Sequence, residues 1–285
     1  MKKVLLSIAI FSFLLLSTQS AKAQILKRLK DNVSSKVENK VNGAVDKFLD
    51  GKDSSGAATT SSTAGVKGTD SNIFANAVKD FNFKTASTLV FSDDFSEDSI
   101  GSMAQFWKTS GSGSVANLPD QSGKWLLLKE FTSYKLKSNT PLPDNFTLEF
   151  DIATQSNTNA KDLNELKFGF THDNAINNYI SDAYNDNAIT STSVHYWNKA
   201  ITNSSSDTKI YNTTDFPLAE YAVGKMHVAI EVRNKHMIIY LDKVKVLDTE
   251  MFGRDQEKKY FYVSTGTELS NGAEIGISNF KLASF

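Results

Sequence analysis

The stretch that decides the fold is residues 146–152, with the sequence FTLEFDI. Apolar and polar residues alternate along it, which is typical of an extended strand with one face in a core. Phe150 lies on the apolar face, and Glu149 lies on the opposite, polar face. Pro141 and Pro143 precede the stretch and a polar run follows it, so both ends of the strand are marked. The sequence therefore predicts a full-length strand on which the other strands pack.

Further strand-like stretches follow one another from residue 81 to residue 285. The pairs Asn234-Lys235 and Asp242-Lys243 predict tight hairpin turns between neighbouring strands. The predicted strands are Thr88–Ser92, Trp125–Lys129, Tyr134–Lys137, Phe146–Ala153, Leu166–Thr171, Ser193–Trp197, Lys209–Asn212, Met226–Val232, His236–Leu241, Val244–Leu247, Tyr260–Ser264 and Glu274–Leu282. About a dozen strands with polar turns predict an all-β, two-sheet antiparallel jelly-roll sandwich over residues 81–285. Alternating βα patterns do not occur, which argues against a parallel-sheet enzyme.

The first 23 residues have the three parts of a signal peptide. Two lysines follow Met1, and residues 4–16 form an apolar core that is shorter than the about 20 residues of a membrane span. The sequence Ala-Lys-Ala at 21–23 fits the cleavage pattern, so we expect Gln24 to be the mature N-terminus. The alternative is an uncleaved N-terminal anchor. The predicted location is the periplasm or the outer cell envelope, or the protein is secreted.

Residues 24–50 have helical periodicity. Apolar residues recur every three or four positions from Leu26 to Phe48, and most of the basic residues lie off this stripe. One interpretation is an amphipathic helix that binds a membrane surface or associates with itself, and the other is a helix that covers part of its own domain. Residues 51–80 are rich in Gly, Ser, Thr and Ala. They predict a flexible linker that can include a short helix over residues 71–80.

The composition excludes several kinds of protein. The chain has 285 residues and a formal net charge of -1. Deducting the three lysines of the leader from 31 basic residues leaves 28 against 32 acidic ones, a net charge of -4. This balance gives no concentrated basic surface for nucleic acid. The chain has no cysteine, which excludes disulfides, thiol catalysis, thiolate metal sites and a lipid-anchored N-terminus.

Five stretches of the β region together resemble a known fold family. They are residues 91–96 (FSDDFS), 106–107 (FW), 123–127 (GKWLL), 142–151 (LPDNFTLEFD) and 275–280 (IGISNF). The region is similar to the concanavalin A-like lectin/glucanase sandwich, the jelly roll also used by laminin-G-like modules. It looks closest to the version that precedes the C-terminal domain of some OmpA-family envelope proteins. No peptidoglycan-associating domain follows the sandwich here, so the role of that domain is not implied.

The glucanase branch of that superfamily carries the strand motif Glu-x-Asp-x-x-Glu. Glu149 and Asp151 match its first two positions, but the third position is Thr154. A retaining glycosidase needs two carboxyl groups about 5 Å apart, one on each side of the bond. The acid/base of that mechanism is therefore missing, and the resemblance does not imply an enzyme. The alternative interpretation is that Glu149 and Asp151 lie on the solvated face of a strand.

No metal or cofactor is predicted. The four histidines, at positions 172, 195, 227 and 236, do not have the spacing of a metal motif. Asp93 and Asp94 could contribute to a structural Ca²⁺ site, as in some members of the resembled fold. A Ca²⁺ ion needs six or more oxygen ligands, which the sequence does not assemble.

The candidate binding residues lie in the polar segment 171–203, which is rich in asparagine and aromatic residues. Exposed rings can stack on sugar rings, and amides can bond the sugar hydroxyls. The predicted ligand-binding residues are Trp197, His195, Tyr196, Tyr179 and Asn187. If residues 193–197 form a strand, His195 and Trp197 share one face and Tyr196 takes the other. The alternative is a long polar loop whose rings pack into the sandwich.

These observations predict an exported, non-enzymatic binding module for a glycan or another component of the cell envelope. One alternative is a glycoside hydrolase or lyase whose carboxylates lie elsewhere on the concave face. Another is a structural envelope protein that associates through residues 24–50.

Overall fold

The structure is a computed structural model that describes residues 81–185 and 187–285. The signal peptide predicted at 1–23, the helix at 24–50 and the linker at 51–80 lie outside the described residues. None of the helices in the described ranges is long and apolar enough to cross a membrane.

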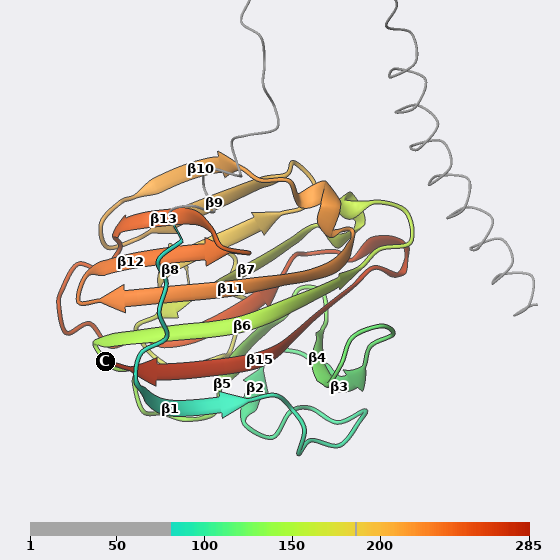
Figure 1. Cartoon of the computed structure of the whole chain (residues 1–285), viewed down its shortest axis with the longest axis horizontal. Coiled ribbons are helices and arrows are strands. Elements are labelled where there is room, and N and C mark those ends of the chain that lie inside the picture. Colours follow the sequence, from blue (N-terminus) through green and yellow to red (C-terminus); the bar gives the residue numbers. More distant parts are fainter. Residues whose placement is uncertain (1–80, 186) are drawn as a thin grey trace, which may run out of the picture. The chain divides into compact units, whose positions relative to one another are not determined.

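The described residues form two antiparallel sheets, as predicted (Figure 1). Sheet A has the strand order β13-β12-β11-β6-β15-β4-β3, and β1 also pairs with β15. Its strands are β1 (Thr88–Asp93), β3 (Gly113–Asn117), β4 (Lys124–Leu128), β6 (Asn145–Gln155), β11 (Val223–Arg233), β12 (His236–Leu241), β13 (Val244–Glu250) and β15 (Glu274–Ser284).

Sheet B has the strand order β10-β9-β8-β7-β14-β5-β2. Its strands are β2 (Trp107–Thr109), β5 (Ser133–Leu136), β7 (Glu165–Thr171), β8 (Ala188–His195), β9 (Ala200–Ser205), β10 (Tyr211–Asp215) and β14 (Tyr260–Thr265). Three short 3-10 helices, η1 (Ala160–Leu163), η2 (Leu218–Tyr221) and η3 (Ser270–Gly272), lie in the connections. Two antiparallel sheets that pack face to face without closing form a jelly-roll sandwich.

Strand β6 contains the predicted stretch and lies in the middle of sheet A, between β11 and β15. Phe150 is 1% exposed, and its ring lies 5.4 Å from Phe168 and 5.6 Å from Phe261, both in sheet B. The apolar face of the stretch therefore faces the other sheet, as the alternation predicts.

The predicted hairpin turns also occur. Strands β11 and β12 pair up to Arg233 and His236, so two residues connect them. Strands β12 and β13 pair from Leu241 and Val244, and the two residues between them both have positive φ. This backbone conformation matches the right-handed twist of the paired strands.

Three strands, β2, β3 and β9, were not predicted, and β8 ends two residues earlier than predicted. β2 and β3 have three and five residues, and the Gly and Ser residues of β3 do not give an alternating pattern. β8 begins at Ala188 and ends at His195, whereas the sequence predicted a strand over 193–197. Trp197 therefore lies in the turn before β9 and is not a strand residue.

Residues 81–87 cross the outer face of sheet A before β1 begins (Figure 1). The ring of Phe81 lies 5.1 Å from the ring of Tyr240, which is only 1% exposed although it belongs to the outer face. Thr85 Oγ1 donates to Glu149 Oε1 at 2.6 Å, and the Ala86 amide donates to Thr147 Oγ1 at 3.0 Å. This segment thus removes part of the polar face of β6 from solvent.

The connection from β7 to β8 covers part of the outer face of sheet B. Ile180 packs against Tyr262 and Ala188, and its amide donates to Ser133 Oγ at 2.8 Å. Lys135 is fully buried on this face, and its ammonium donates to the carbonyl of Ala175 at 2.6 Å. Beyond this connection, where β7 begins and β8 ends, side chains of the outer face remain partly exposed.

Candidate functional site

Three polar side chains meet on the outer face of sheet B, where β7 begins and β8 ends. Glu165 and Lys167 are two residues apart on β7, so they point to the same face. His195 lies directly opposite Glu165 on β8, and Ser193 lies opposite Lys167. Neighbouring strands thus place a carboxylate, an ammonium and an imidazole side by side.

The three groups form a connected network. Glu165 accepts from Lys167, and His195 Nδ1 lies 3.1 Å from the other carboxylate oxygen of Glu165. Lys167 also donates to the hydroxyl of Tyr179 at 3.2 Å, and Tyr179 donates to the carbonyl of Thr265 at 2.7 Å. Burial raises the pKa of Glu165, but His195 and Lys167 outweigh it, so the net pKa is lowered. Glu165 is therefore an ionised hydrogen-bond acceptor at neutral pH.

Exposed aromatic rings flank this network on two sides. Trp197 is 52% exposed, and its ring centroid lies 5.9 Å from that of His195 at an interplanar angle of 71°. Phe131 is 59% exposed, and its ring centroid lies 4.5 Å from that of Tyr179 at 31°. We call the six residues the Glu165 site: Phe131, Glu165, Lys167, Tyr179, His195 and Trp197.

Hydroxyl side chains continue the same face beyond the Glu165 site. Ser193 pairs with Lys167 on one side and with Thr202 of β9 on the other. Thr202 Oγ1 lies 3.1 Å from Thr213 Oγ1 on the edge strand β10. Ser191 Oγ is buried in this row and has no hydrogen-bond partner within the described residues. Ser191, Ser193 and Thr202 are at most 8% exposed, so this row is a buried polar layer beside the Glu165 site.

The structure brings three of the five predicted ligand residues together and separates the other two. Trp197, His195 and Tyr179 belong to the Glu165 site. The prediction for Tyr196 is wrong, because its side chain is 0% exposed in the core, on the opposite side of β8 from His195. Asn187 lies at the far end of β8, where its Nδ2 donates to Asp173 Oδ2 at 2.7 Å, so it is not part of the site.

Sequence reasoning missed Phe131, Glu165 and Lys167. The signal for Glu165 and Lys167 was present, because they lie on the polar face of the alternating strand at 166–170. Phe131 gave no such signal. It lies in a turn with a φ of 51°, and its amide donates to the carbonyl of Gly266 at 2.7 Å, which ties the turn to the loop after β14.

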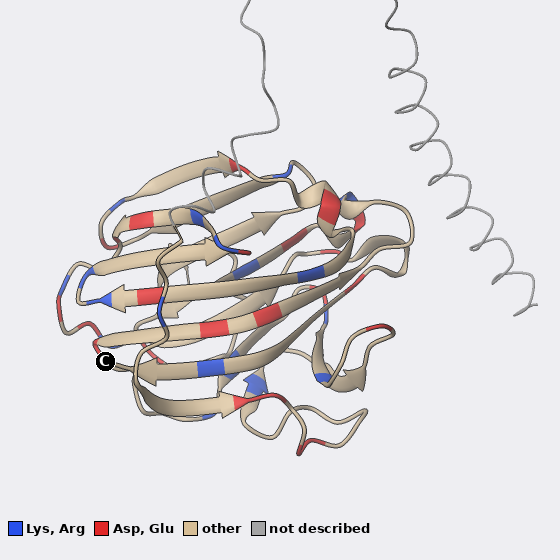
Figure 2. Ribbon diagram, in the orientation of Figure 1, with Lys and Arg blue, Asp and Glu red and all other residues tan. Residues whose placement is uncertain are grey.

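The prediction that Glu149 and Asp151 lie on a solvated face is wrong. Asp151 is only 6% exposed, and residues 81–87 cover part of Glu149. His227 on β11 lies between them, with Nδ1 2.7 Å from Asp151 and Nε2 3.4 Å from Glu149. Figure 2 shows these acidic positions on β6 with basic positions on the neighbouring strands of sheet A.

This cluster has the electrostatics of an ion-pair network. Burial raises the pKa values of Glu149 and Asp151, but hydrogen bonds from His227 and other neighbours, together with nearby positive charges, outweigh it and lower both. Hydrogen bonds to Asp151 and Glu149 raise the pKa of His227 to about 9. A glycosidase acid needs a carboxyl group with a raised pKa. Neither carboxyl group of this pair meets that requirement.

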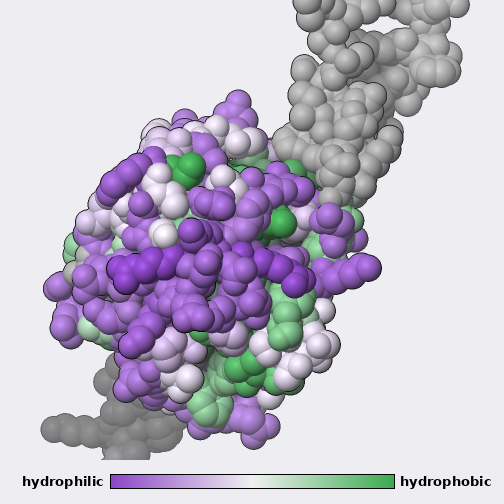
Figure 3. Space-filling view, turned by 90° about the vertical axis from the view of Figure 1, so that its left-hand side faces the viewer, coloured by the Kyte–Doolittle hydropathy of each residue, from purple (hydrophilic) through white to green (hydrophobic). Residues whose placement is uncertain are grey.

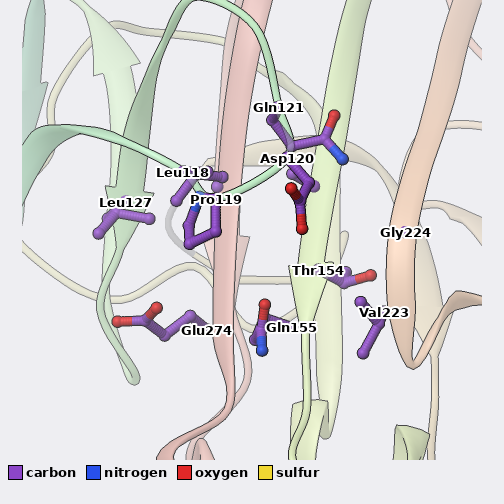
Figure 4. Close-up of a pocket in the computed structure, with 12 residues that line it drawn as sticks. Leu118, Pro119, Asp120, Gln121, Leu127, Thr154, Gln155, Val223, Gly224 and Glu274 are labelled. Carbon is purple, nitrogen blue, oxygen red and sulfur yellow. The ribbon is translucent and has the colours of Figure 1, made fainter. Parts of the chain in front are cut away.

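The position of the missing glucanase carboxylate lies beside a small hollow between the 118–121 loop and strands β6, β11 and β15 (Figure 4). Thr154 Oγ1 donates to the carbonyl of Tyr221 at 2.6 Å, so the hydroxyl is occupied by the backbone. Asp120 and Glu274 also line the hollow. Its volume is about 80 Å³, whereas ligand sites have about 300–1,000 Å³, so the hollow does not accommodate a sugar ring beside two carboxylates.

The carboxylates considered for calcium make local contacts instead. Asp93 accepts from the Trp107 indole at 2.9 Å and from the Phe95 amide at 3.0 Å. The ammonium of Lys124 donates to the carbonyls of Ser96 and Asp98 at 2.7 and 2.6 Å. Within residues 81–185 and 187–285, no group of three or more His, Asp or Glu side chains is placed to hold a metal ion.

Comparison with solved structures agrees with the architecture described above. The chain is similar to arcelin-5, a lectin-like defense protein from Phaseolus vulgaris, with a TM-score of 0.50, 12% identity, and coverage of 70% of this chain and 99% of that one. It is also similar to the carbohydrate recognition domain of Emp47p, with a TM-score of 0.50, 15% identity, and coverage of 71% and 99%. The fold is a concanavalin A-like jelly roll.

Other similar structures include the carbohydrate binding module CBM66 from Bacillus subtilis, with a TM-score of 0.41, 15% identity, and coverage of 63% of this chain and 96% of that one. No family model matches the sequence, and no curated protein matches it. At these identities the similarity establishes the jelly roll, and the function of this chain has to be argued from its own residues.

Proposed function

We propose that this jelly roll is a non-enzymatic glycan-binding module that binds its ligand at the Glu165 site. The observation that carries the proposal is the placement of the exposed Trp197 ring beside His195 and Glu165 on the outer face of sheet B. An exposed ring beside fixed donors and acceptors suits a sugar, because the ring covers the apolar face of a pyranose and the polar groups bond its hydroxyls.

The state of the polar groups supports binding rather than catalysis. Glu165 is engaged by both Lys167 and His195, and its pKa is lowered, so it can accept hydrogen bonds but is a poor general acid. The names of the similar structures, lectin-like arcelin-5 and the Emp47p carbohydrate recognition domain, are in line with this proposal. The glycoside hydrolase alternative has no comparable support, because no suitable carboxylate pair occurs among the sites described above.

A glycan array followed by titration with the best glycan tests the proposal. Stacking on an exposed aromatic ring contributes about 1–3 kcal/mol, by analogy with base stacking, so Trp197→Ala should weaken binding about 5- to 150-fold. The melting temperature should not change, because Trp197 is half exposed in a turn. Ile100→Ala is the matched control, since Ile100 is 58% exposed in the connection between β1 and β2. A wild type that binds no glycan, or a Trp197→Ala variant that binds equally well, would refute the proposal.

We also propose that the protein is exported and acts in the periplasm, in the outer envelope or outside the cell, where its ligand is an envelope glycan. The support is the predicted signal peptide at 1–23. Intact-mass analysis of envelope protein should give a mature chain that begins at Gln24, and a mass that retains residues 1–23 contradicts the proposal. The apolar stripe at 24–50 would add attachment to a membrane surface or to a second copy, and vesicle binding with and without this stretch tests it.

A further inference from the structure

An apolar pocket opens between the two sheets, away from the Glu165 site. Sheet A contributes Phe91 of β1 and Leu282 of β15, and sheet B contributes Leu136 of β5 and Phe261 of β14. The 137–143 loop completes the wall. The pocket has a volume of about 420 Å³, which lies within the range of small-molecule sites.

The floor of this pocket belongs to the hydrophobic core, while its mouth exposes apolar side chains. Leu142, Phe261 and Leu282 are 9%, 2% and 3% exposed. At the mouth, Val90 and Phe106 are 49% and 46% exposed. Figure 3 shows apolar surface low on one side of the molecule, at the level at which β1 lies in Figure 1. Exposed apolar surface that continues into a core is typical of a binding site rather than of ordinary surface.

Two of the polar side chains that line the pocket, Asn174 and Tyr260, are bonded to backbone carbonyls. Asn174 Nδ2 donates to the carbonyls of Leu136 and Ser138 at 3.0 and 2.6 Å, and the Tyr260 hydroxyl donates to the carbonyl of Asn139 at 3.2 Å. Lys137 is the one charged residue among the described lining residues. Its ammonium has three donor hydrogens, and the Gln105 carbonyl accepts one of them at 2.6 Å. The inside of the pocket is therefore mostly apolar, and a positive charge lies beside it at Lys137.

We propose that the pocket between the sheets binds a small amphipathic carboxylate with a flexible hydrocarbon chain. The hydrocarbon chain of the ligand lies between β1 and β14, in contact with the core side chains. The carboxylate of the ligand lies at the mouth beside Lys137. A hydrocarbon chain fits because most of the lining residues are apolar. A carboxylate fits because the lining carries one cation and no acidic side chain. The site is independent of the Glu165 site, since the two share no residue.

Isothermal titration of the full chain with sodium dodecanoate, kept below its micelle concentration, tests this proposal. Dodecyltrimethylammonium has the same chain with the opposite charge, and 2-naphthoate has the same head on an aromatic body. We expect dodecanoate to bind, and we expect the other two probes to bind at least tenfold more weakly. Equal or tighter binding of dodecyltrimethylammonium would overturn the preference for a carboxylate. Equal or tighter binding of 2-naphthoate would overturn the preference for a flexible hydrocarbon chain. No binding of dodecanoate would overturn the whole proposal.

Two mouth variants locate the binding within the molecule. Val90 lies at a bulge in the pairing of β1 with β15, so Val90→Trp can block the mouth without removing a core side chain. Val223→Trp is its control, because Val223 is 60% exposed on β11 and does not line this pocket. Phe106→Asp adds a negative charge at the mouth and should weaken dodecanoate binding at least tenfold. An unchanged dodecanoate affinity in both mouth variants would overturn the assignment.

The remaining tests concern the cation and a protein occupant. Lys137→Gln should weaken dodecanoate binding about threefold, the size of an exposed ion pair, while Lys129→Gln should not. Sedimentation of the wild type and of Val90→Trp shows whether a second copy fills the pocket instead. A wild-type dimer that dissociates in Val90→Trp, together with no dodecanoate binding, would assign the pocket to self-association and overturn the proposal.

Discussion

The His227 cluster predicts a pH-dependent part of the stability. Asp151 and Glu149 raise the pKa of His227 from 6.5 to about 9, so the folded state holds the proton more tightly than the unfolded state does. A group whose pKa is raised on folding stabilises the protein fully below its unfolded pKa and loses this contribution as the pH rises through its folded pKa. The stabilisation should therefore be complete below about pH 6.5 and should disappear as the pH rises towards about 9.

The size of this contribution follows from the pKa change and the exposure of the ring. A rise from 6.5 to about 9 corresponds to about 3.4 kcal/mol without screening. The side chain of His227 is 43% exposed, so solvent screening reduces the effect to about 1 kcal/mol. For a folded region of this size, about 1 kcal/mol shifts the melting temperature by about 2–4 °C.

Thermal unfolding of the wild type and of His227→Gln between pH 6 and 9.5 measures this contribution. The wild type should melt about 2–4 °C above the variant at pH 6, and the difference should vanish by about pH 9.5. His236→Gln is the control, because His236 pairs with the half-exposed Asp248 at the surface and should give a smaller difference. A constant difference between the wild type and His227→Gln across the range would show that the proton on His227 does not stabilise the fold.

Three further predictions concern the core and catalysis. Phe150→Ala should lower the free energy of unfolding by about 3–5 kcal/mol, because removing a ring packed against Phe168 and Phe261 leaves a cavity. Glu149→Ala should lower it by under about 1.5 kcal/mol. Equal melting temperatures for the two variants would contradict the assigned faces of β6. Tyr196→Phe should leave stability unchanged or raise it by about 1 kcal/mol in chemical denaturation, because the buried hydroxyl has no partner among the described residues, and a clear loss would reveal one. The protein should release no reducing ends from laminarin, and release that Glu149→Gln abolishes would show that the cluster with His227 is catalytic after all.

The strength of the sequence signals differed between strands for a physical reason. In β6 every second side chain enters the core, so the alternation of FTLEFDI is complete and the strand was predicted correctly. In β8 and β9 the outer face carries small polar residues, and Thr192 and Asn203 bond each other at 2.8 Å within the buried layer. Polar residues on both faces weaken the period-two pattern, and for this reason the end of β8 and the position of Trp197 were wrongly predicted.

The local sequence determined which residue types were available to the Glu165 site. It did not determine which of these residues lie next to one another. Aromatic and polar residues in segment 171–203 identified Trp197, His195 and Tyr179 as candidates. Glu165 joins His195 only because β7 and β8 pair in one particular register. Such a register depends on the fit of whole strands and turns, which no short window of sequence contains.

The sequence by itself determined the all-β class, the presence of strand β6, and the face of β6 that enters the core. These follow from the alternation of side chains along a single strand, which is a local property of the chain. Only the tertiary structure decided that residues 81–87 cover Glu149, that Phe131 approaches Tyr179, and that a pocket opens between β1 and β14. Each of these arrangements joins segments far apart in the chain, and their positions are set by the packing of two complete sheets against each other.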